Sequence, residues 1–227
     1  MSVAPKRAFG QHFLVDENIL RVIERLAGLE SDDVVLEVGP GLGILTAFLA
    51  PRVAHVHAVE IDRTLEPELR ERLAAAGNVA IVWGDALHTD LAGLDPAPTA
   101  LVANLPYNVA TPIVVESLSR LPTLRSWCVM VQKEVADRFF AQPSTKDYGA
   151  VSVLVQLCAR RTGRHPVSRH VFRPPPNVES ALVAFQRIPR PDRYDAVRDV
   201  VVAAFAHRRK TLANALEHGG VADRGTT

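Results

Sequence analysis

The stretch Val34-Val35-Leu36-Glu37-Val38-Gly39-Pro40-Gly41-Leu42-Gly43 decides the fold expected of this 227-residue chain. Its apolar first half predicts a short buried strand, and the glycines let the backbone turn sharply into a helix expected over residues 43–51. The glycine spacing is G-x-G-x-G, whereas the dinucleotide fingerprint is G-x-G-x-x-G, and Pro40 lacks an N–H that could bind phosphate. The turn is therefore predicted to bind a ligand without a diphosphate, with a purely structural turn as the alternative.

Strands and helices alternate on both sides of this turn. A helix capped by Asp16 is expected over residues 16–29. Beyond the turn, strands are expected at 53–61, 79–82, 99–104 and 127–131, and helices at 65–76, 112–121 and 133–140. Such alternation is typical of an α/β fold in which helices cover both faces of a parallel sheet.

The pattern changes after Gly149. Residues 151–158 fit either a strand or a helix, residues 160–176 predict a basic, proline-rich connection, and residues 180–187 predict a late edge strand. Prolines among charged residues at 188–193 predict a linker, and helical spacing returns over 195–216. We therefore expect residues 1–187 to form the main domain and residues 188–227 the start of a small helical domain.

The distribution of charge along the chain indicates which kind of partner the protein binds. Residues 1–159 carry 13 Lys and Arg against 19 Asp and Glu, whereas residues 160–210 carry 12 against 4. A basic segment on an acidic body favours nucleic acid as the partner, with a solvated surface as the alternative.

The remaining composition points to a soluble cytoplasmic protein. No apolar run is long enough to span a bilayer, and no apolar segment follows Lys6 and Arg7 as it would in a secretion signal. Cys128 and Cys158 lie in apolar runs, so we expect buried thiols rather than a disulfide. The spacing of the eight histidines predicts no metal site.

The ends of the next strands carry acceptors suited to an adenosine. Glu60 lies 21 residues beyond Gly39, where an acidic side chain can accept hydrogen bonds from ribose hydroxyls. Asp85 follows the third strand and could accept from an adenine amino group, although a turn-forming Asp fits equally well. Together with Gly39 and Gly41 these residues predict a site for S-adenosylmethionine.

The fourth strand ends in Asn104-Leu105-Pro106-Tyr107, the most informative motif for chemistry. The exocyclic nitrogen of adenine is a poor nucleophile because its lone pair is delocalised into the ring. The amide oxygen of Asn104 and the carbonyl of Leu105 could accept both amino hydrogens, while Pro106 holds that carbonyl outward. Tyr107 offers a face on which an unstacked base can lie, so the motif predicts methylation of a nucleobase amine.

Five motifs in order resemble the KsgA-type ribosomal RNA adenine dimethyltransferases, relatives of the Erm antibiotic-resistance methylases. They are Lys6-Arg7-Ala8-Phe9-Gly10-Gln11-His12-Phe13-Leu14, Glu37-Val38-Gly39-Pro40-Gly41, Asn104-Leu105-Pro106-Tyr107-Asn108, Phe172-Arg173-Pro174-Pro175-Pro176-Asn177-Val178-Glu179-Ser180 and Arg208-Arg209-Lys210-Thr211-Leu212. The resemblance spans residues 6–216. It implies a Rossmann-like class I methyltransferase sheet with a terminal antiparallel strand, followed by a small helical domain that is incomplete here.

The resemblance also implies roles for individual residues. It implies cofactor contacts from His12, Leu14, Gly39, Glu60, Asp85 and Asn104, with Gln11 and Gly41 as neighbours. Phe172 is implied to cover the target adenine opposite Tyr107. Arg208, Arg209 and Lys210 are expected to bind RNA.

The expected activity is N6,N6-dimethylation of adenosines in 16S ribosomal RNA by a monomer that acts on a small-subunit precursor. Alternatives are an Erm-like 23S methyltransferase and a ribosome-assembly factor with residual activity. A dinucleotide-dependent oxidoreductase is disfavoured by the glycine spacing. DNA adenine and protein glutamine methylases are disfavoured by Leu105, which replaces the first proline of their loops, and by the basic segment.

Overall fold

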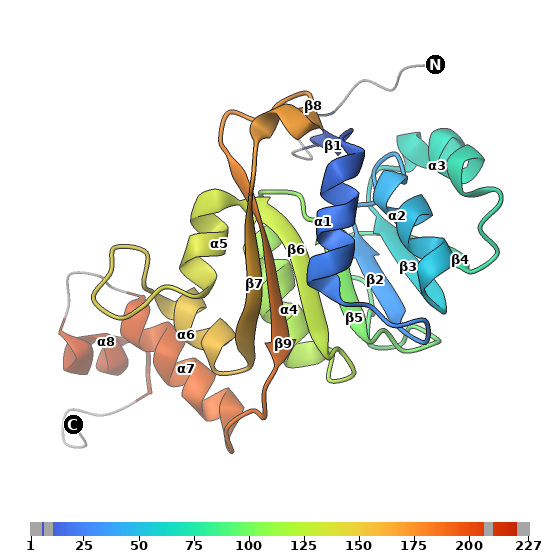
Figure 1. The fold of residues 1–227 in the computed structure, drawn as a ribbon. Coiled ribbons are helices and arrows are strands. Elements are labelled where there is room, and N and C mark those ends of the chain that lie inside the picture. The colour runs from blue at the N-terminus through green and yellow to red at the C-terminus, as the bar shows by residue number, and fades with distance from the viewer. Residues whose placement is uncertain (1–5, 7–10, 207–210, 222–227) are drawn as a thin grey trace.

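A computed structural model describes residues 6, 11–206 and 211–221 (Figure 1). Its centre is a seven-stranded sheet in the order β4-β3-β2-β5-β6-β9-β7. The strands are β2 (Val34–Val38), β3 (His55–Glu60), β4 (Val79–Trp83), β5 (Ala100–Asn104), β6 (Ser126–Gln132), β7 (Ala159–Val167) and β9 (Ser180–Arg187). The five strands from β2 to β6 are parallel, and β9 is antiparallel to both β6 and β7.

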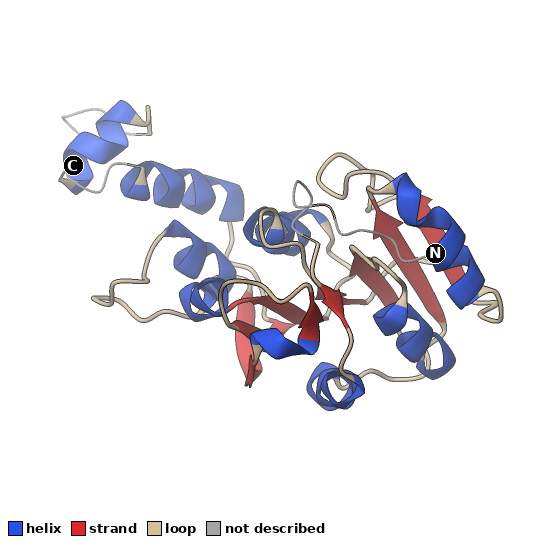
Figure 2. Cartoon of the chain, turned by 90° about the horizontal axis from the view of Figure 1, so that it is seen from above, coloured by secondary structure: helices blue, strands red, loops and turns tan. Residues whose placement is uncertain are grey.

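Helices cover both faces of this sheet (Figures 1 and 2). On one face, α1 (Glu17–Ala27) and α2 (Ile44–Leu49) bury Ile23 and Leu49 against the sheet, and α3 (Glu66–Leu73) contacts α2. On the other face lie α4 (Ala110–Arg120), α5 (Lys133–Phe139) and α6 (Ala150–Gln156). The α/β architecture expected from the alternation of elements is therefore confirmed. Of residues 151–158, left open between strand and helix, the first six lie in the helix α6.

The prediction for the last strands was wrong in two respects. Residues 180–187 form β9, which lies inside the sheet between β6 and β7, and the first six of its residues are buried. The edge strand is instead β7, within the segment predicted as a basic connection. Pro166 and a register shift between Arg161 and Gly163 obscure the strand pattern of β7, and both features are tolerated at a sheet edge.

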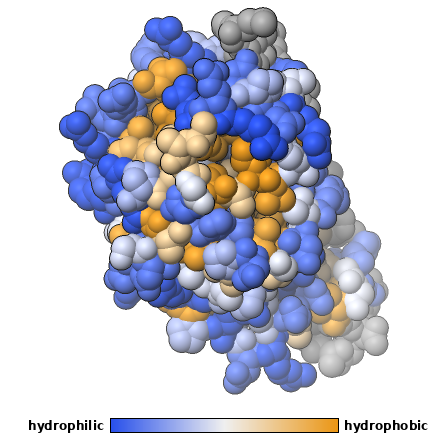
Figure 3. All heavy atoms as spheres, turned by 90° about the vertical axis from the view of Figure 1, so that its right-hand side faces the viewer, coloured by the Kyte–Doolittle hydropathy of each residue, from blue (hydrophilic) through white to orange (hydrophobic). Residues whose placement is uncertain are grey.

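The opposite edge of the sheet is β4, whose five residues are all half-buried. Figure 3 faces the side of the molecule on which β4 and α3 lie, and apolar side chains gather there inside a hydrophilic rim. The two sheet edges therefore differ in character, since β4 contains no charged residue and β7 contains three arginines.

The C-terminal part consists of two helices where continuous helical spacing had been expected. They are α7 (Tyr194–Phe205) and α8 (Leu212–His218), which contact each other, and α7 also contacts α6. Tyr194 lies in the same buried cluster as Trp127 of β6. A boundary at residue 188 stays a prediction. In the part of the chain that is described, no helix is both long and apolar enough to cross a membrane.

A two-stranded sheet joins the N-terminal segment to the segment that precedes β9. It pairs β1 (Phe13–Leu14) with β8 (Phe172–Arg173), and the 3-10 helix η4 (Arg169–Val171) comes directly before β8. The Asp16 carboxylate accepts the backbone N–H of Asn18, which confirms the predicted cap of α1. Residues 13–17 are thereby held over the end of the main sheet.

Candidate active site

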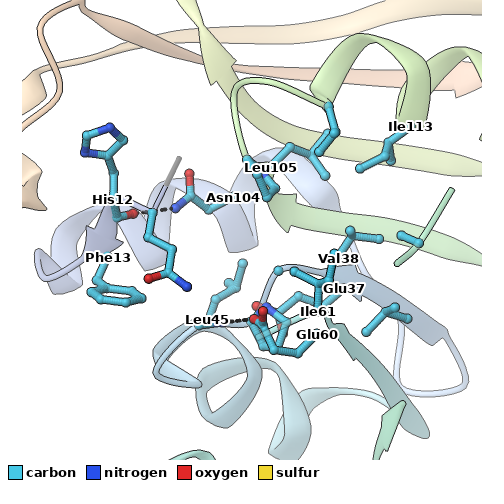
Figure 4. Close-up of a pocket in the computed structure, with 18 of the residues that line it drawn as sticks. His12, Phe13, Glu37, Val38, Leu45, Glu60, Ile61, Asn104, Leu105 and Ile113 are labelled. Atoms are coloured by element: carbon cyan, nitrogen blue, oxygen red, sulfur yellow. Dashed lines mark hydrogen bonds between the residues drawn. The ribbon is translucent and has the colours of Figure 1, made fainter. Parts of the chain in front are cut away.

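A cavity of about 340 Å³ lies at the carboxyl ends of β2, β3, β4 and β5 (Figure 4). This is where open α/β sheets bind ligands, and the volume suits a small molecule. Of the predicted cofactor residues, all eight line this cavity: Gln11, His12, Leu14, Gly39, Gly41, Glu60, Asp85 and Asn104. Leu105, Pro106 and Tyr107 line it as well.

The glycine turn forms one wall of the cavity at very close approach to the Asn104 turn. Gly39 has a φ of 76°, and a Cβ placed there would lie 3.2 Å from the Cγ and Cδ atoms of Pro106. Gly41 has a φ of 58°, and its N–H donates to Glu60 Oε2 over 3.1 Å. A side chain at position 39 would therefore be strained in its backbone conformation and would press on the Pro106 ring.

Glu60 is 4% exposed and stabilises the turn beside it. Its Oε2 accepts from Gly41, and its Oε1 accepts the N–H of Asp62 over 2.9 Å. Burial is the main cause that raises the pKa of Glu60, and the nearby charge of Asp62 adds to the rise. The backbone hydrogen bonds oppose it. The carboxylate thus orders the cavity wall and also lines the cavity.

Asp62 bonds the N-terminal segment to the end of β3. It accepts from Lys6 Nζ over 2.7 Å and from Gln11 Nε2 over 2.9 Å, and it caps the short helix η3 (Arg63–Leu65) through Thr64. Burial opposes ionisation, yet the hydrogen bonds from Lys6, Thr64 and Gln11 lower the pKa of Asp62 to about 2. Asp62 was not expected in the site, because none of the sequence motifs indicates this pairing.

Asp85 has the geometry of a turn former while lining the cavity. Its Oδ1 accepts the N–H of Leu87 over 2.9 Å, and its Oδ2 lies 2.8 Å from His88 Nδ1. The backbone hydrogen bond from Leu87 is the largest cause that lowers the pKa of Asp85. The position of Asp85 is therefore compatible with both roles left open by the sequence, an acceptor for an adenine amino group and a turn former.

Glu37 is a buried carboxyl whose Oε2 has no hydrogen-bond partner among the described residues. It lies near Glu60 in the cavity wall (Figure 4) and is 1% exposed. Burial raises the pKa of Glu37 to about 8. The Thr46 hydroxyl opposes this rise, and the negative charge of Glu60 adds to it. An orphaned polar oxygen at a cavity wall fits a ligand that brings a hydrogen-bonding group to it.

The side-chain amide of Asn104 has a fixed orientation. Its Nδ2 donates to the backbone oxygen of His12 over 3.1 Å, drawn as a dashed line in Figure 4. Because the amino end of the amide is used in this bond, the opposite end, Oδ1, is left as an acceptor. The neighbouring Leu105 is fixed by its own N–H, which donates to the Met130 oxygen over 3.0 Å.

Tyr107 is held by its hydroxyl and covered by a histidine. Its Oη lies 2.6 Å from Ser180 Oγ, at the start of β9. The ring of His12 stacks on the tyrosine ring with 5.4 Å between centroids and 30° between planes, and His12 Nδ1 lies 2.8 Å from the Pro174 oxygen. Burial raises the pKa of Tyr107, against the Ser180 hydrogen bond.

Phe172 is not brought to the cavity in this structure. It is 1% exposed and packs in the cluster that contains Leu14, its partner in the β1–β8 pair. The expected stack of Phe172 opposite Tyr107 is absent among the described residues, and His12 occupies the tyrosine face. The predicted RNA-binding residues Arg208, Arg209 and Lys210 lie outside the described residues.

Several cavity residues had no role in the sequence analysis. Phe13, Ile61 and Ile113 supply apolar surface, and Ile61 is 48% exposed directly after Glu60. A large apolar residue placed directly after a strand, and exposed there, indicates a surface on which an aromatic ring can bind. Within the described residues, no cluster of three or more His, Cys, Asp or Glu could hold a metal ion.

Comparisons with known proteins agree with this geometry. A family model described as ribosomal RNA adenine dimethylase matches residues 4–226. The ribosomal RNA small subunit methyltransferase A of Rubrobacter xylanophilus is 52% identical over 213 residues, 93% of this chain and 80% of the relative. That of Thermobifida fusca is 48% identical over 95% of this chain and 78% of the relative.

Solved structures give the same result for the fold. A dimethyladenosine transferase from Plasmodium falciparum matches with a TM-score of 0.77 and 28% identity over 92% of this chain and 76% of that chain. The 23S ribosomal RNA methyltransferase ErmE matches with a TM-score of 0.69 and 29% identity over 91% of this chain and 84% of that chain. The predicted class I methyltransferase fold, the resemblance and the prediction of an enzyme are thereby confirmed. With a family match that covers nearly its whole length, this chain belongs to the ribosomal RNA adenine dimethylases.

Proposed function

We propose that this protein transfers methyl groups from S-adenosylmethionine to the N6 atom of adenosines in the RNA of the small ribosomal subunit, two to each adenosine. The observation that carries the proposal is the oriented amide of Asn104, whose Oδ1 is left as an acceptor at the cavity. An adenine amino group offers two N–H donors, which this oxygen and the Leu105 carbonyl can accept together.

The residues of the cavity fit this cofactor. Glu60 and Asp85 offer carboxylate acceptors for ribose hydroxyls and an adenine amine, and Ile61 offers apolar surface for the ring. The unpartnered oxygen of Glu37 leaves a polar atom at the cavity wall for a group of the ligand, and Gly39 lets the glycine turn pack directly against Pro106 beside it. When bound, S-adenosylmethionine supplies an electrophilic methyl group attached to a sulfonium.

The side chains beside the target base orient it rather than remove its proton. Acceptance of both amino hydrogens favours a pyramidal nitrogen whose lone pair points away from Asn104 and Leu105. Tyr107 would support the base once His12 leaves its face, and the predicted place of Phe172 over the base requires that ring to leave the core. No strong base is needed, because the proton can depart after the displacement.

The small subunit is proposed as the partner because of the relatives' names. The relatives from Rubrobacter xylanophilus and Thermobifida fusca are both called small subunit methyltransferases, whereas the 23S enzyme ErmE is 29% identical. We propose action as a monomer in the cytoplasm, where such precursors would be encountered. The free, buried Cys128 and Cys158 suit a reducing compartment.

The test is methylation with labelled S-adenosylmethionine of small and large ribosomal subunits that lack the modification. We expect label in dimethyladenosine of the small-subunit RNA. Label confined to large-subunit RNA would replace this proposal with an Erm-like activity. A single-turnover experiment without any label in either subunit would leave an assembly factor as the remaining function.

Cofactor choice is tested separately by thermal unfolding. A ligand at 100 times its Kd stabilises by about 2.7 kcal/mol, which is roughly 5–10 °C in Tm for a chain of this size. We expect that shift with S-adenosylmethionine and none with NAD. The reverse result would favour the oxidoreductase alternative.

A further inference from the structure

The outer edge of the main sheet carries a series of cations that the proposed chemistry does not use. They are Arg160, Arg161 and Arg164 in β7, Arg169 in η4 and Arg173 in β8, hereafter the β7 track. All five are exposed. Residues 159–178 include these five arginines and two histidines but no Asp or Glu.

Few of these charges are neutralised by neighbours. Within the described part of the chain, Arg164 is the one track residue in an ion pair, with Asp137 Oδ1 at 2.6 Å. Asp137 also pairs with Lys133, so its single negative charge is shared by two cations. Glu179 accepts the backbone N–H of Arg169 over 3.0 Å. The track therefore keeps a net positive charge.

The β7 track extends toward the candidate active site. Since β7 and β6 are both antiparallel to β9, β7 runs parallel to β6 and β5 and ends on the same side of the sheet as Asn104. Its last residue, Val167, pairs with Ser180, whose hydroxyl contacts Tyr107. With about 3.3 Å per strand residue, Arg160 lies roughly 20–25 Å from that end.

Protection of a sheet edge does not account for so many arginines. Edge strands are guarded by charged side chains, a proline or a bulge, and β7 already has Pro166 and a register shift after Arg161. The series also continues past the strand, to Arg169 and Arg173. The opposite edge, β4, has no charged residue.

We infer that the β7 track binds the phosphate backbone of the ribosomal RNA segment next to the target adenosine and holds that segment along the sheet edge as far as Tyr107. Arginine forks match phosphate oxygens, and backbone contacts of this kind position a nucleic acid without reading its sequence. The inference rests on the proposed function for the identity of the RNA, and it assigns a docking surface separate from Arg208, Arg209 and Lys210.

The test compares two double variants that each remove two positive charges. Arg160→Gln with Arg161→Gln alters the far end of the track, whereas Arg70→Gln with Arg72→Gln alters α3 on the other side of the sheet. Binding of small-subunit RNA is measured over a range of salt concentrations. Removal of one arginine–phosphate pair should reduce the slope of log K against log salt by about 1, so we expect a reduction of about 2 and roughly tenfold weaker binding at low salt.

The α3 variant should bind RNA with the wild-type slope. Equal slopes for the track variant and the wild type, or equally weakened binding in the two variants, would overturn the inference. S-adenosylmethionine affinity and kcat at saturating RNA should stay at wild-type values in the track variant, with the defect confined to KM. A wild-type protein that binds RNA but transfers no methyl group would instead contradict the proposed function.

A cross-linking experiment distinguishes RNA from protein as the partner. Thr162 is exposed at the register shift of β7, so a photo-reactive side chain can replace it without disturbing the core. Irradiation with small-subunit particles should attach the protein to RNA near the methylated nucleotide. Attachment to a ribosomal protein alone would overturn the assignment.

Discussion

At the scale of single residues, two polar side chains in the cavity wall have measurable consequences. Asn104 is bonded at one end to His12 and offers its other end to the cavity. Glu37 has an oxygen for which no partner exists in the described chain. The first residue affects the geometry of a substrate, whereas the second affects how stability depends on pH.

Replacement of Asn104 by alanine removes one of the two acceptors for the amino hydrogens. Loss of a single oriented group at a reacting centre typically costs about 10²–10³-fold in rate, so we expect at least a hundredfold lower kcat. Binding of RNA should persist, because its affinity comes mainly from cations that contact phosphate. Methyl transfer and RNA binding measured on the same preparation would check this, and full activity of Asn104→Ala would exclude the role of the amide.

Replacement of Glu37 by glutamine should change the pH dependence of folding. In the unfolded chain the carboxyl titrates near 4.5, and in the folded protein burial raises its pKa to about 8. The folded state therefore retains a proton that the unfolded state loses, and this stabilisation is complete below pH 4.5 and is lost as the pH rises toward 8. The loss amounts to roughly a kilocalorie per mole for each pH unit.

We therefore expect the Tm of Glu37→Gln, relative to the wild type, to rise steadily between about pH 5 and pH 8. Glu60, the other carboxyl that acts on Glu37, is unchanged in this comparison. A constant difference in Tm over that range would show that Glu37 is ionised in the folded protein.

The residue scale also shows where the sequence was informative. Glycines, carboxylates and Asn104 at successive strand ends were predictable, because the ends of parallel strands meet at one edge of the sheet. The burial of Phe172 and the stack of His12 on Tyr107 were not predictable. Phe172 pairs with Leu14, and His12 contacts the Pro174 oxygen, so both features involve segments that are far apart in the sequence.

At the scale of elements, the glycine turn after β2 is in direct contact with the turn after β5. The space for a side chain at Gly39 is occupied by the Pro106 ring at 3.2 Å. The cofactor wall and the predicted catalytic turn are therefore one packed unit, and a disturbance at the first should reach the second.

Gly39→Ala and Gly28→Ala form a matched pair that tests this contact. Both glycines have positive φ, which costs an alanine about 1–2 kcal/mol, but Gly28 has nothing within 4 Å of the added carbon. We expect similar losses of backbone stability in both variants, with more than tenfold slower methyl transfer only in Gly39→Ala. Thermal unfolding and single-turnover transfer would measure the two effects, and equal rates would show that the turns act independently.

The elements that the sequence did not predict correctly are those defined by long-range pairing. A continuous apolar run in residues 181–185 indicates a strand buried on both faces, but its neighbours β6 and β7 could not be inferred locally. The helical spacing over 195–216 corresponds to two helices, α7 and α8. An apolar period predicts helical structure, but it does not show where one helix ends and the next begins.

At the scale of the whole molecule, the charge is divided between an acidic body and a basic C-terminal third. The β7 track accounts for part of the basic segment, and Arg208 and Arg209 lie beyond it in the sequence. Charge reversal at Arg208 and Arg209 should weaken RNA binding and flatten its salt dependence by about one unit for each phosphate that is no longer neutralised. Titrations at several salt concentrations would check this, and an unchanged slope would remove these residues from the interface.

The β1–β8 pair joins two segments separated by most of the described chain. During synthesis, the residues around Phe13 must therefore wait until Arg173 has emerged before their own strand can form. Chain growth of roughly 5–20 residues per second makes this delay on the order of ten to thirty seconds. A nascent chain that has only β2 to β6 could form much of the parallel sheet, but the part of the cavity wall formed by Phe13 and Leu14 would gain its strand pairing only after Arg173 had left the ribosome.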